Sequence, residues 1–177
     1  MKKWFAFIAA VVFFFFVHEG LHALTASFFG EYQAFHVRPL GLEVTFKTPV
    51  AERAGWHWAL ISGASNLATI LLGYLLLGFG KRIHQLDNST LKATLYYLTF
   101  LGLFLDPLNL SLGPLLYGGD ANGIAVGLGI PRWIIQGVFL VLFFINRELI
   151  ARVLVPAYGV ETDHILLRPW LRKARSA

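Results

Sequence analysis

Four stretches of this sequence are each long and apolar enough to cross a lipid bilayer as a helix. A spanning helix needs about 20 mostly apolar residues, and the four candidates cover residues 4–29, 56–79, 93–112 and 132–155. Of the 177 residues, 56% are apolar and 14% are charged, against about 25% charged residues in an ordinary soluble domain. We therefore predict an all-α integral membrane protein with about four transmembrane helices.

The composition excludes several other classes of protein. The chain has no cysteine, so it cannot be a disulfide scaffold. Its net charge is +5, but the basic residues form short clusters beside apolar runs, which is typical of a membrane flank and not of a nucleic-acid patch. These clusters are Lys2 and Lys3, Lys81 and Arg82, and Arg168, Arg172, Lys173 and Arg175. We expect a lipid bilayer as partner and no nucleic acid.

The lysines and arginines also predict an orientation. If the N-terminus is inside, the cytoplasmic side carries Lys92, Arg147 and Arg152 besides those clusters. The other side carries Arg38, Lys47 and Arg53, and Arg132 lies at the boundary. Positive charge gathers on the cytoplasmic side, so both termini are expected inside, with residues 157–177 as a basic cytoplasmic tail. No internal repeat is seen. We expect residues 1–177 to form one domain of a multi-pass protein of the plasma membrane.

The segment between the first two spans has the pattern of a β-strand. Apolar residues alternate with polar residues or glycine over residues 40–47, and this period of two is typical of a half-buried strand. Pro39 and Gly41 can form a tight turn after residues 34–37. We predict a short β-hairpin that lies against the membrane face of the bundle.

The first span contains the sequence His18-Glu19-Gly20-Leu21-His22, which has the form H-E-x-x-H. Residues i and i+4 lie on one face of a helix, so the two imidazoles can bind one metal ion, and Glu19 can take a proton from water beside it. A charge at the centre of a span costs about 2.5–3.5 kcal/mol. Three ionisable groups within five residues therefore indicate a metal site, for which zinc is the expected ion.

Catalytic zinc commonly has three protein ligands and one open position, so a third ligand is needed. Two aspartates lie near the spans. Asp106 stands before Pro107 in the third span, where it can otherwise be a solvated carboxylate at a helix kink. Asp120 follows Gly118 and Gly119, where it can otherwise cap a short helix over residues 121–128. The residues alone leave both open.

The second span has a row of small and polar residues on one face, namely Ser62, Asn66, Thr69 and Gly73. Such a row lets helices approach closely and form hydrogen bonds. Within it, Asn66 is also a candidate for stabilising an oxyanion. Asn109 in the third span is a second candidate for that role.

The remaining histidines and the tryptophans have simpler interpretations. His36, His57, His84 and His164 stand alone, and we expect solvated or interfacial side chains. Trp4, Trp56, Trp58, Trp133 and Trp170 lie near the ends of spans, where tryptophan commonly anchors a helix at the membrane interface.

Several of these motifs together resemble the site-2 protease family of intramembrane zinc metalloproteases. His18 to Ala23, followed by Phe28-Phe29-Gly30, resembles the first motif of that family. Ser62 to Leu67 resembles its small-residue stretch ending in Asn. The order Asn109, Pro114, Gly119-Asp120 resembles its third motif. The resemblance covers about residues 10–125 and includes the predicted hairpin.

The resemblance implies a fold, a reaction and a ligand set. It implies Zn²⁺ held by His18, His22 and Asp120, with Glu19 as the catalytic base. The implied reaction is hydrolysis of a peptide bond within or near a transmembrane segment of another protein or peptide. The chain departs from the family in the long spacing from Asn109 to Asp120, and the Leu-Asp pair occurs at Asp106. The family's metal site faces the cytoplasm, whereas the charge count puts the His18 end of the first span outside.

Two other functions are weighed against this one. A non-catalytic metal-binding or scaffold membrane protein would keep the histidines without needing Glu19 as a base. A metalloprotease with a glutamate as third ligand would have to use Glu148, which lies beside Arg147 without a companion acidic motif.

For the proteolytic function, the strand over residues 40–46 is expected to hold an extended substrate by β-augmentation.

Overall fold

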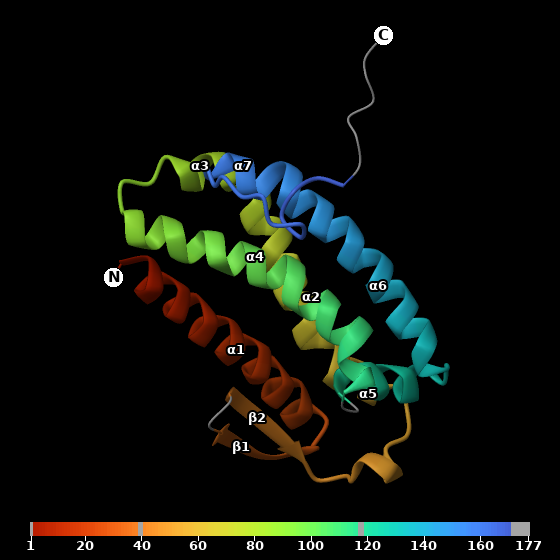
Figure 1. Ribbon diagram of the computed structural model, residues 1–177. Coiled ribbons are helices and arrows are strands. Elements are labelled where there is room, and N and C mark those ends of the chain that lie inside the picture. The colour runs from red at the N-terminus through yellow and green to blue at the C-terminus, as the bar shows by residue number, and fades with distance from the viewer. Residues whose placement is uncertain (1, 39–40, 117–118, 171–177) are drawn as a thin grey trace.

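The computed structural model describes residues 2–38, 41–116 and 119–170, and it is a helical bundle with one small sheet (Figure 1). Its larger elements are α1 (Lys2–Phe28), β1 (Tyr32–Arg38), β2 (Gly41–Phe46), α2 (His57–Gly78), α4 (Ser89–Leu112), α5 (Gly119–Leu128) and α6 (Arg132–Leu149). The short elements are 3₁₀ turns at Val50–Glu52 and Gly113–Leu115, helices α3 (Gly80–His84) and α7 (Val155–Ala157), and a π-helical turn at Ile150–Leu154.

Three of these helices are long and apolar enough to cross a membrane. They are α1, α2 and the continuous helical segment Ser89–Leu115 that begins with α4. The fourth expected span is also helical, but α6 has only 18 residues and contains Arg132, Arg147 and Glu148. Within the described residues, the structure therefore supports three of the four predicted spans by length and composition.

The predicted hairpin is confirmed. Strands β1 and β2 pair antiparallel, with Phe35 opposite Val44 and Val37 opposite Leu42. The turn residues Pro39 and Leu40, like Arg172, Lys173 and Arg175 of the tail, lie outside the described residues. The hairpin lies beside the C-terminal half of α1 (Figure 1), and the buried side chain of Val44 faces inward.

The row of small and polar residues on α2 is buried, as expected. Helix α2 packs against α1, α4 and α5, and Ser62, Asn66 and Thr69 are each at most 5% exposed. A Cβ atom on Gly102 of α4 would lie 2.5 Å from the carbonyl oxygen of Thr69 and 3.1 Å from Cα of Gly73. The two backbones therefore touch where both helices have glycine.

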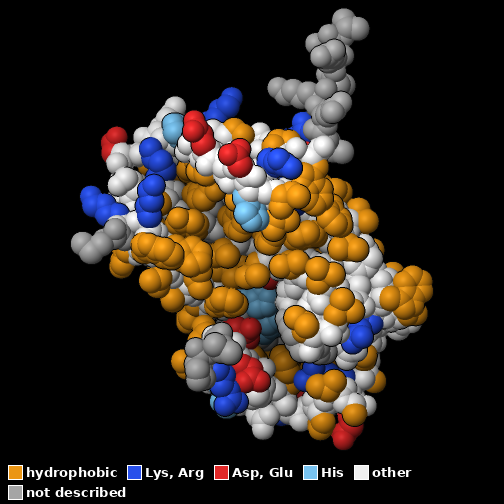
Figure 2. Space-filling model, in the orientation of Figure 1, with side chains coloured by type: hydrophobic (Ala, Val, Ile, Leu, Met, Phe, Trp, Pro, Cys, Tyr) orange, Lys and Arg blue, Asp and Glu red, His pale blue; other side chains and the backbone are white. Residues whose placement is uncertain are grey.

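The ends of the bundle differ from its middle. The start of α1 and the helices α3 and α7 lie toward one end, and the hairpin and α5 lie toward the other (Figure 1). Figure 2 shows that side chains of Lys, Arg, Asp and Glu gather toward these ends, with a broad apolar band between them. This distribution is the one that a bilayer-spanning bundle requires.

One local prediction needs correction. Trp58 is not an interface anchor, because it is 1% exposed and the guanidinium of Arg53 stacks on its ring at 4.4 Å. The other four tryptophans are exposed.

The described part of the tail folds back on α6, where the buried Arg147 stacks on Trp170 at 3.8 Å and donates a 2.7 Å hydrogen bond to the carbonyl oxygen of Ile165.

The contact between Gly73 and Gly102 can be tested by enlarging one of them. Gly102→Val should lower the stability of the bundle by about 1–3 kcal/mol or more, because a side chain there must push α2 and α4 apart. Gly137→Val is the matched control, since a Cβ on Gly137 of α6 meets nothing within 4 Å. Thermal unfolding in detergent measures both variants, and equal melting temperatures would contradict the close contact.

Candidate metal centre

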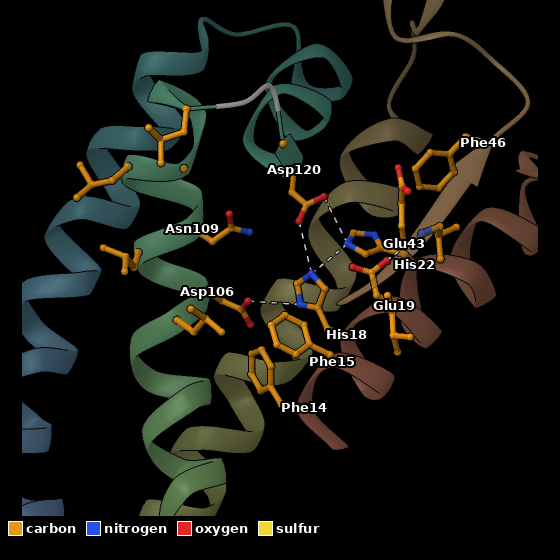
Figure 3. A pocket seen from close by; sticks show the side chains of 18 residues that line it. Phe14, Phe15, His18, Glu19, His22, Glu43, Phe46, Asp106, Asn109 and Asp120 are labelled. Atoms are coloured by element: carbon orange, nitrogen blue, oxygen red, sulfur yellow. Dashed lines mark hydrogen bonds and ion pairs between the residues drawn. The ribbon is translucent and has the colours of Figure 1, made fainter. Parts of the chain in front are cut away.

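The H-E-x-x-H residues lie in the last three turns of α1, opposite α2 and α5. His18 and His22 are 6% and 4% exposed and face the interior of the bundle. Glu19 is half-buried and lies beside β2 (Figure 3). The helical spacing thus turns both imidazoles toward one point and brings the carboxylate close to it.

Three side chains converge on this point. Nε2 of His18 and Nε2 of His22 are 3.2 Å apart, and the carboxylate of Asp120 lies 3.6 Å from the first and 3.4 Å from the second. His18, His22 and Asp120 form a group that could hold a metal ion, with one ligand atom from each lying within 4.8 Å of the others.

These distances fit a tetrahedral zinc site. Ligand atoms about 2.0–2.1 Å from zinc at tetrahedral angles are about 3.4 Å apart. The two Nε2 atoms are 3.2 Å apart, Oδ2 of Asp120 lies 3.6 Å from Nε2 of His18, and Oδ1 of Asp120 lies 3.4 Å from Nε2 of His22. These distances are close to that value, with a different carboxylate oxygen of Asp120 facing each ring. Among the described residues the group has three members, and three protein ligands would leave one position of a tetrahedral ion open, as in catalytic zinc sites.

The second ring nitrogen of His22 has a partner that orients the imidazole. Nδ1 lies 2.7 Å from the carbonyl oxygen of Ile61, which can only accept a hydrogen bond. Nδ1 therefore carries the proton, and the lone pair of a neutral imidazole is on Nε2. The hydroxyl of Ser65 lies 2.8 Å from that same Nε2. Both partners come from α2.

Asp120 reaches the histidines from the first turn of α5. Gly119 before it has φ of +56°, a left-handed conformation that glycine adopts without strain. Nδ2 of Asn66 donates a 3.0 Å hydrogen bond to Oδ2 of Asp120. Burial by itself raises the pKa of this carboxyl, but the imidazoles of His22 and His18 outweigh it and hold the pKa of Asp120 well below its usual range.

Helix α5 lies this close to α2 because it has glycine at the contact. A Cβ on Gly123 would collide with the side chain of Ser62, and one on Gly127 would collide with the backbone of Ala59. Asp120 thus lies one turn before the close approach of these two helices.

The other candidate ligand, Asp106, has a different environment. Its Oδ1 lies 3.4 Å from Nδ1 of His18, the ring nitrogen that does not face His22 and Asp120, and Oδ2 accepts a hydrogen bond from the hydroxyl of Thr69. The interpretation of Asp106 as a solvated carboxylate is wrong, because the residue is 2% exposed. Pro107 does not end the helix, since α4 continues to Leu112.

The two asparagines proposed for an oxyanion lie in different places. Asn66 is fully buried, and its amide group also lies 3.0 Å from the carbonyl oxygen of Ser62. Its amide hydrogens are thus directed to Asp120 and to its own helix. Asn109 lines the cavity beside the histidines (Figure 3).

The site opens into a cavity of about 640 Å³ between α1, β2 and α4. Its floor holds His18, Glu19, His22 and Asp120, and its walls are mainly apolar, with Phe14, Phe15, Leu42, Leu105, Leu108 and Leu112 among them. Figure 2 shows a hollow in the apolar band with histidine at its base. The cavity therefore faces the part of the surface that a bilayer would surround.

Glu19 is oriented by the hairpin, a contact that sequence patterns do not reveal. The backbone N–H of Val44 donates a 3.1 Å hydrogen bond to Oε2 of Glu19. The contact with the carbonyl of Ile61 could not be predicted from the sequence either, because every residue has a backbone carbonyl. For Ser65 the sequence provided a weak indication of a place near the site, since Ser65 lies beside Asn66 in the stretch of small residues.

The remaining candidates do not join the site. Among the described residues, none of the other histidines belongs to the metal-binding group. His84 and His164 are exposed, and His36 and His57 are half-buried. Glu148 pairs with Arg147 and Arg152 on α6 and the π-helical turn, so it is not part of this group.

Comparisons with protein-family models, with curated proteins and with solved structures found no match to this chain.

The ligand set predicts which variants retain metal. Wild type should bind about one zinc ion per chain, and His22→Ala and Asp120→Ala should each lose most of it, because each removes one of three ligands. Elemental analysis of protein purified in detergent measures this. His84→Ala is the control and should retain zinc. Full zinc content in Asp120→Ala would contradict the assignment.

Proposed function

We propose that this protein is an intramembrane zinc metalloprotease that resembles the site-2 proteases and hydrolyses a peptide bond within or near a transmembrane segment. The observation that carries the proposal is the convergence of His18, His22 and Asp120 beside Glu19, at the base of an apolar cavity. The apolar cavity lies on the face of the helical bundle that a bilayer would surround, and this favours a substrate within the membrane over a soluble one.

The chain's own residues supply the parts that peptide hydrolysis requires. His18, His22 and Asp120 would hold the zinc. When bound there, the ion supplies Lewis-acid polarisation of a carbonyl group and makes hydroxide available from water near neutral pH. Asn109 lines the same cavity and is the amide that remains a candidate for stabilising an oxyanion.

Glu19 moves the proton. Its carboxylate takes a proton from the attacking water and passes it to the nitrogen of the leaving amine when the C–N bond breaks. The hydrogen bond from the N–H of Val44 occupies Oε2. This contact holds the side chain beside the cavity and leaves Oε1 to receive the proton.

The substrate would bind in an extended form along β2. A helix hides its carbonyl groups in i to i+4 hydrogen bonds, so the substrate must unwind before hydrolysis. The N–H of Val44 points to α1, away from β1. Because alternate N–H groups of a strand point the same way, that of Leu42 points to this same edge, and Leu42 lines the cavity. This edge can pair with an unwound segment.

The proposal extends to topology. Helix α6 with the π-helical turn and α7 would form the fourth span, in which Arg147 is buried and paired with Glu148. The charge distribution favours both termini on the cytoplasmic side. The plasma membrane is the expected location, with another membrane protein or peptide as substrate.

Replacing the base separates catalysis from metal binding. Glu19→Gln should reduce cleavage of a transmembrane reporter by at least about 100-fold, within the range typical of a general base, while zinc content stays at the wild-type level. Glu43→Gln is a matched control at the rim of the same cavity. If Glu19→Gln cleaves as well as wild type, or if wild type binds zinc and cleaves no reporter, a non-catalytic metal-binding or scaffold role is favoured instead.

Pairing of the substrate with β2 has its own test. Leu42→Pro should abolish cleavage and leave zinc content unchanged, because proline removes the N–H from the open edge of the strand. Leu42→Ala keeps that N–H and should retain most of the activity. Cleavage at the wild-type rate by Leu42→Pro would dismiss strand pairing.

A further inference from the structure

Asp106 is a buried carboxylate for which the proposed reaction has no use. It lies in α4, within one of the segments apolar enough to span a membrane, and is 2% exposed. A carboxylate at such a position costs several kcal/mol unless it has hydrogen-bond partners. Its two neighbours are therefore informative.

One neighbour is Thr69 on α2. Its hydroxyl lies within hydrogen-bonding distance of Oδ2 of Asp106 and also 2.8 Å from the carbonyl oxygen of Ser65. A hydroxyl has one proton to donate, and a carboxylate is a stronger acceptor than a carbonyl. Thr69 therefore holds Oδ2 and turns Oδ1 toward α1.

The other neighbour is His18. Its Nδ1 is buried without a hydrogen-bond partner of good geometry, and Oδ1 of Asp106 faces it at 3.4 Å (Figure 3). Nε2 of the same ring points to His22 and Asp120. The nitrogen that faces Asp106 is thus the one that the metal-binding group does not use.

Each of the two histidines thus has an oxygen atom facing its Nδ1, but the oxygen belongs to a backbone carbonyl in one case and to a carboxylate in the other. His22 directs Nδ1 to the carbonyl of Ile61, and His18 directs Nδ1 to the carboxylate of Asp106. A metal-ligating histidine commonly donates its second N–H to a carbonyl or a carboxylate, which fixes the ring and makes the ligand more basic.

We propose that Asp106, held by Thr69, is a positioning residue that accepts the Nδ1 proton of His18 and so presents Nε2 to the metal. This role rests on the proposed zinc centre. It makes Asp106 a support of a ligand and not a ligand itself, and it links three helices, because His18 is on α1, Thr69 on α2 and Asp106 on α4.

The test measures zinc affinity of the full chain in detergent by competition with a chelator. Asp106→Ala should weaken zinc binding about 10–100-fold. Asp106→Asn keeps an oxygen that can accept the Nδ1 proton, so its loss should be smaller. Thr69→Val should also weaken binding, whereas Thr99→Val should not, although Thr99 is equally buried and its hydroxyl donates to the carbonyl of Leu95.

A second measurement reports on the geometry of the site. With Co²⁺ in place of zinc, the visible absorption of Asp106→Ala should shift from that of wild type, and the absorption of Thr99→Val should not. Circular dichroism checks that each variant is folded. If Asp106→Ala does not fold, Asp106→Asn and Thr69→Val, which preserve the buried volume, decide the question.

The outcomes separate this role from the proposed function. Wild-type affinity and absorption in Asp106→Ala would overturn the positioning role and leave the zinc centre intact. Complete loss of zinc in Asp106→Ala, with zinc retained in Asp120→Ala, would make Asp106 the third ligand and overturn it too. Absence of zinc from the wild type would overturn both proposals.

Discussion

The arrangement of this molecule depends on placing ionisable side chains inside an apolar bundle. His18, His22 and Asp106 are each at most 6% exposed, in helices apolar enough to cross a bilayer. Lipid offers them no hydrogen bonds, so every polar atom there needs a protein partner or a metal ion. The contacts to Ile61, Thr69 and Asp120 supply those partners from neighbouring helices.

Close helix packing makes those contacts geometrically feasible. Polar side chains such as threonine and asparagine are short, so their helices must approach closely before they can meet. Gly102 allows α4 to touch α2 beside Thr69, and Gly123 allows α5 to touch α2 beside Ser62. The same glycine contacts that stabilise the bundle thereby set the distances within the candidate metal centre.

The hairpin lies beside both the candidate metal centre and the cavity in which a substrate would bind. One edge of β2 pairs with β1, and its other edge donates to Glu19 through Val44. In the proposed function, a single strand orients the catalytic carboxylate and offers pairing groups to the substrate. Movement of the hairpin would then change both at once.

Local patterns were sufficient to predict much of the fold. The spacing of His18 and His22 needs only the helical period, and the alternation over residues 40–46 needs only the period of a strand. Trp58 could not be predicted in this way, because a tryptophan near the end of a span can face either lipid or protein. In this chain Trp58 is buried in protein and the other tryptophans are exposed. Similarly, hydropathy alone does not identify α6 as a span, because polar residues interrupt its apolar sequence.

The sequence by itself determined the helices, the hairpin and the pair of imidazoles one turn apart, because each depends on residues close together along the chain. Only the tertiary structure decided that Asp120 faces the shared side of the two rings while Asp106 faces the opposite nitrogen of His18. That choice depends on how α4 and α5 pack on α1 and α2, and such packing is set by contacts between residues far apart in the chain.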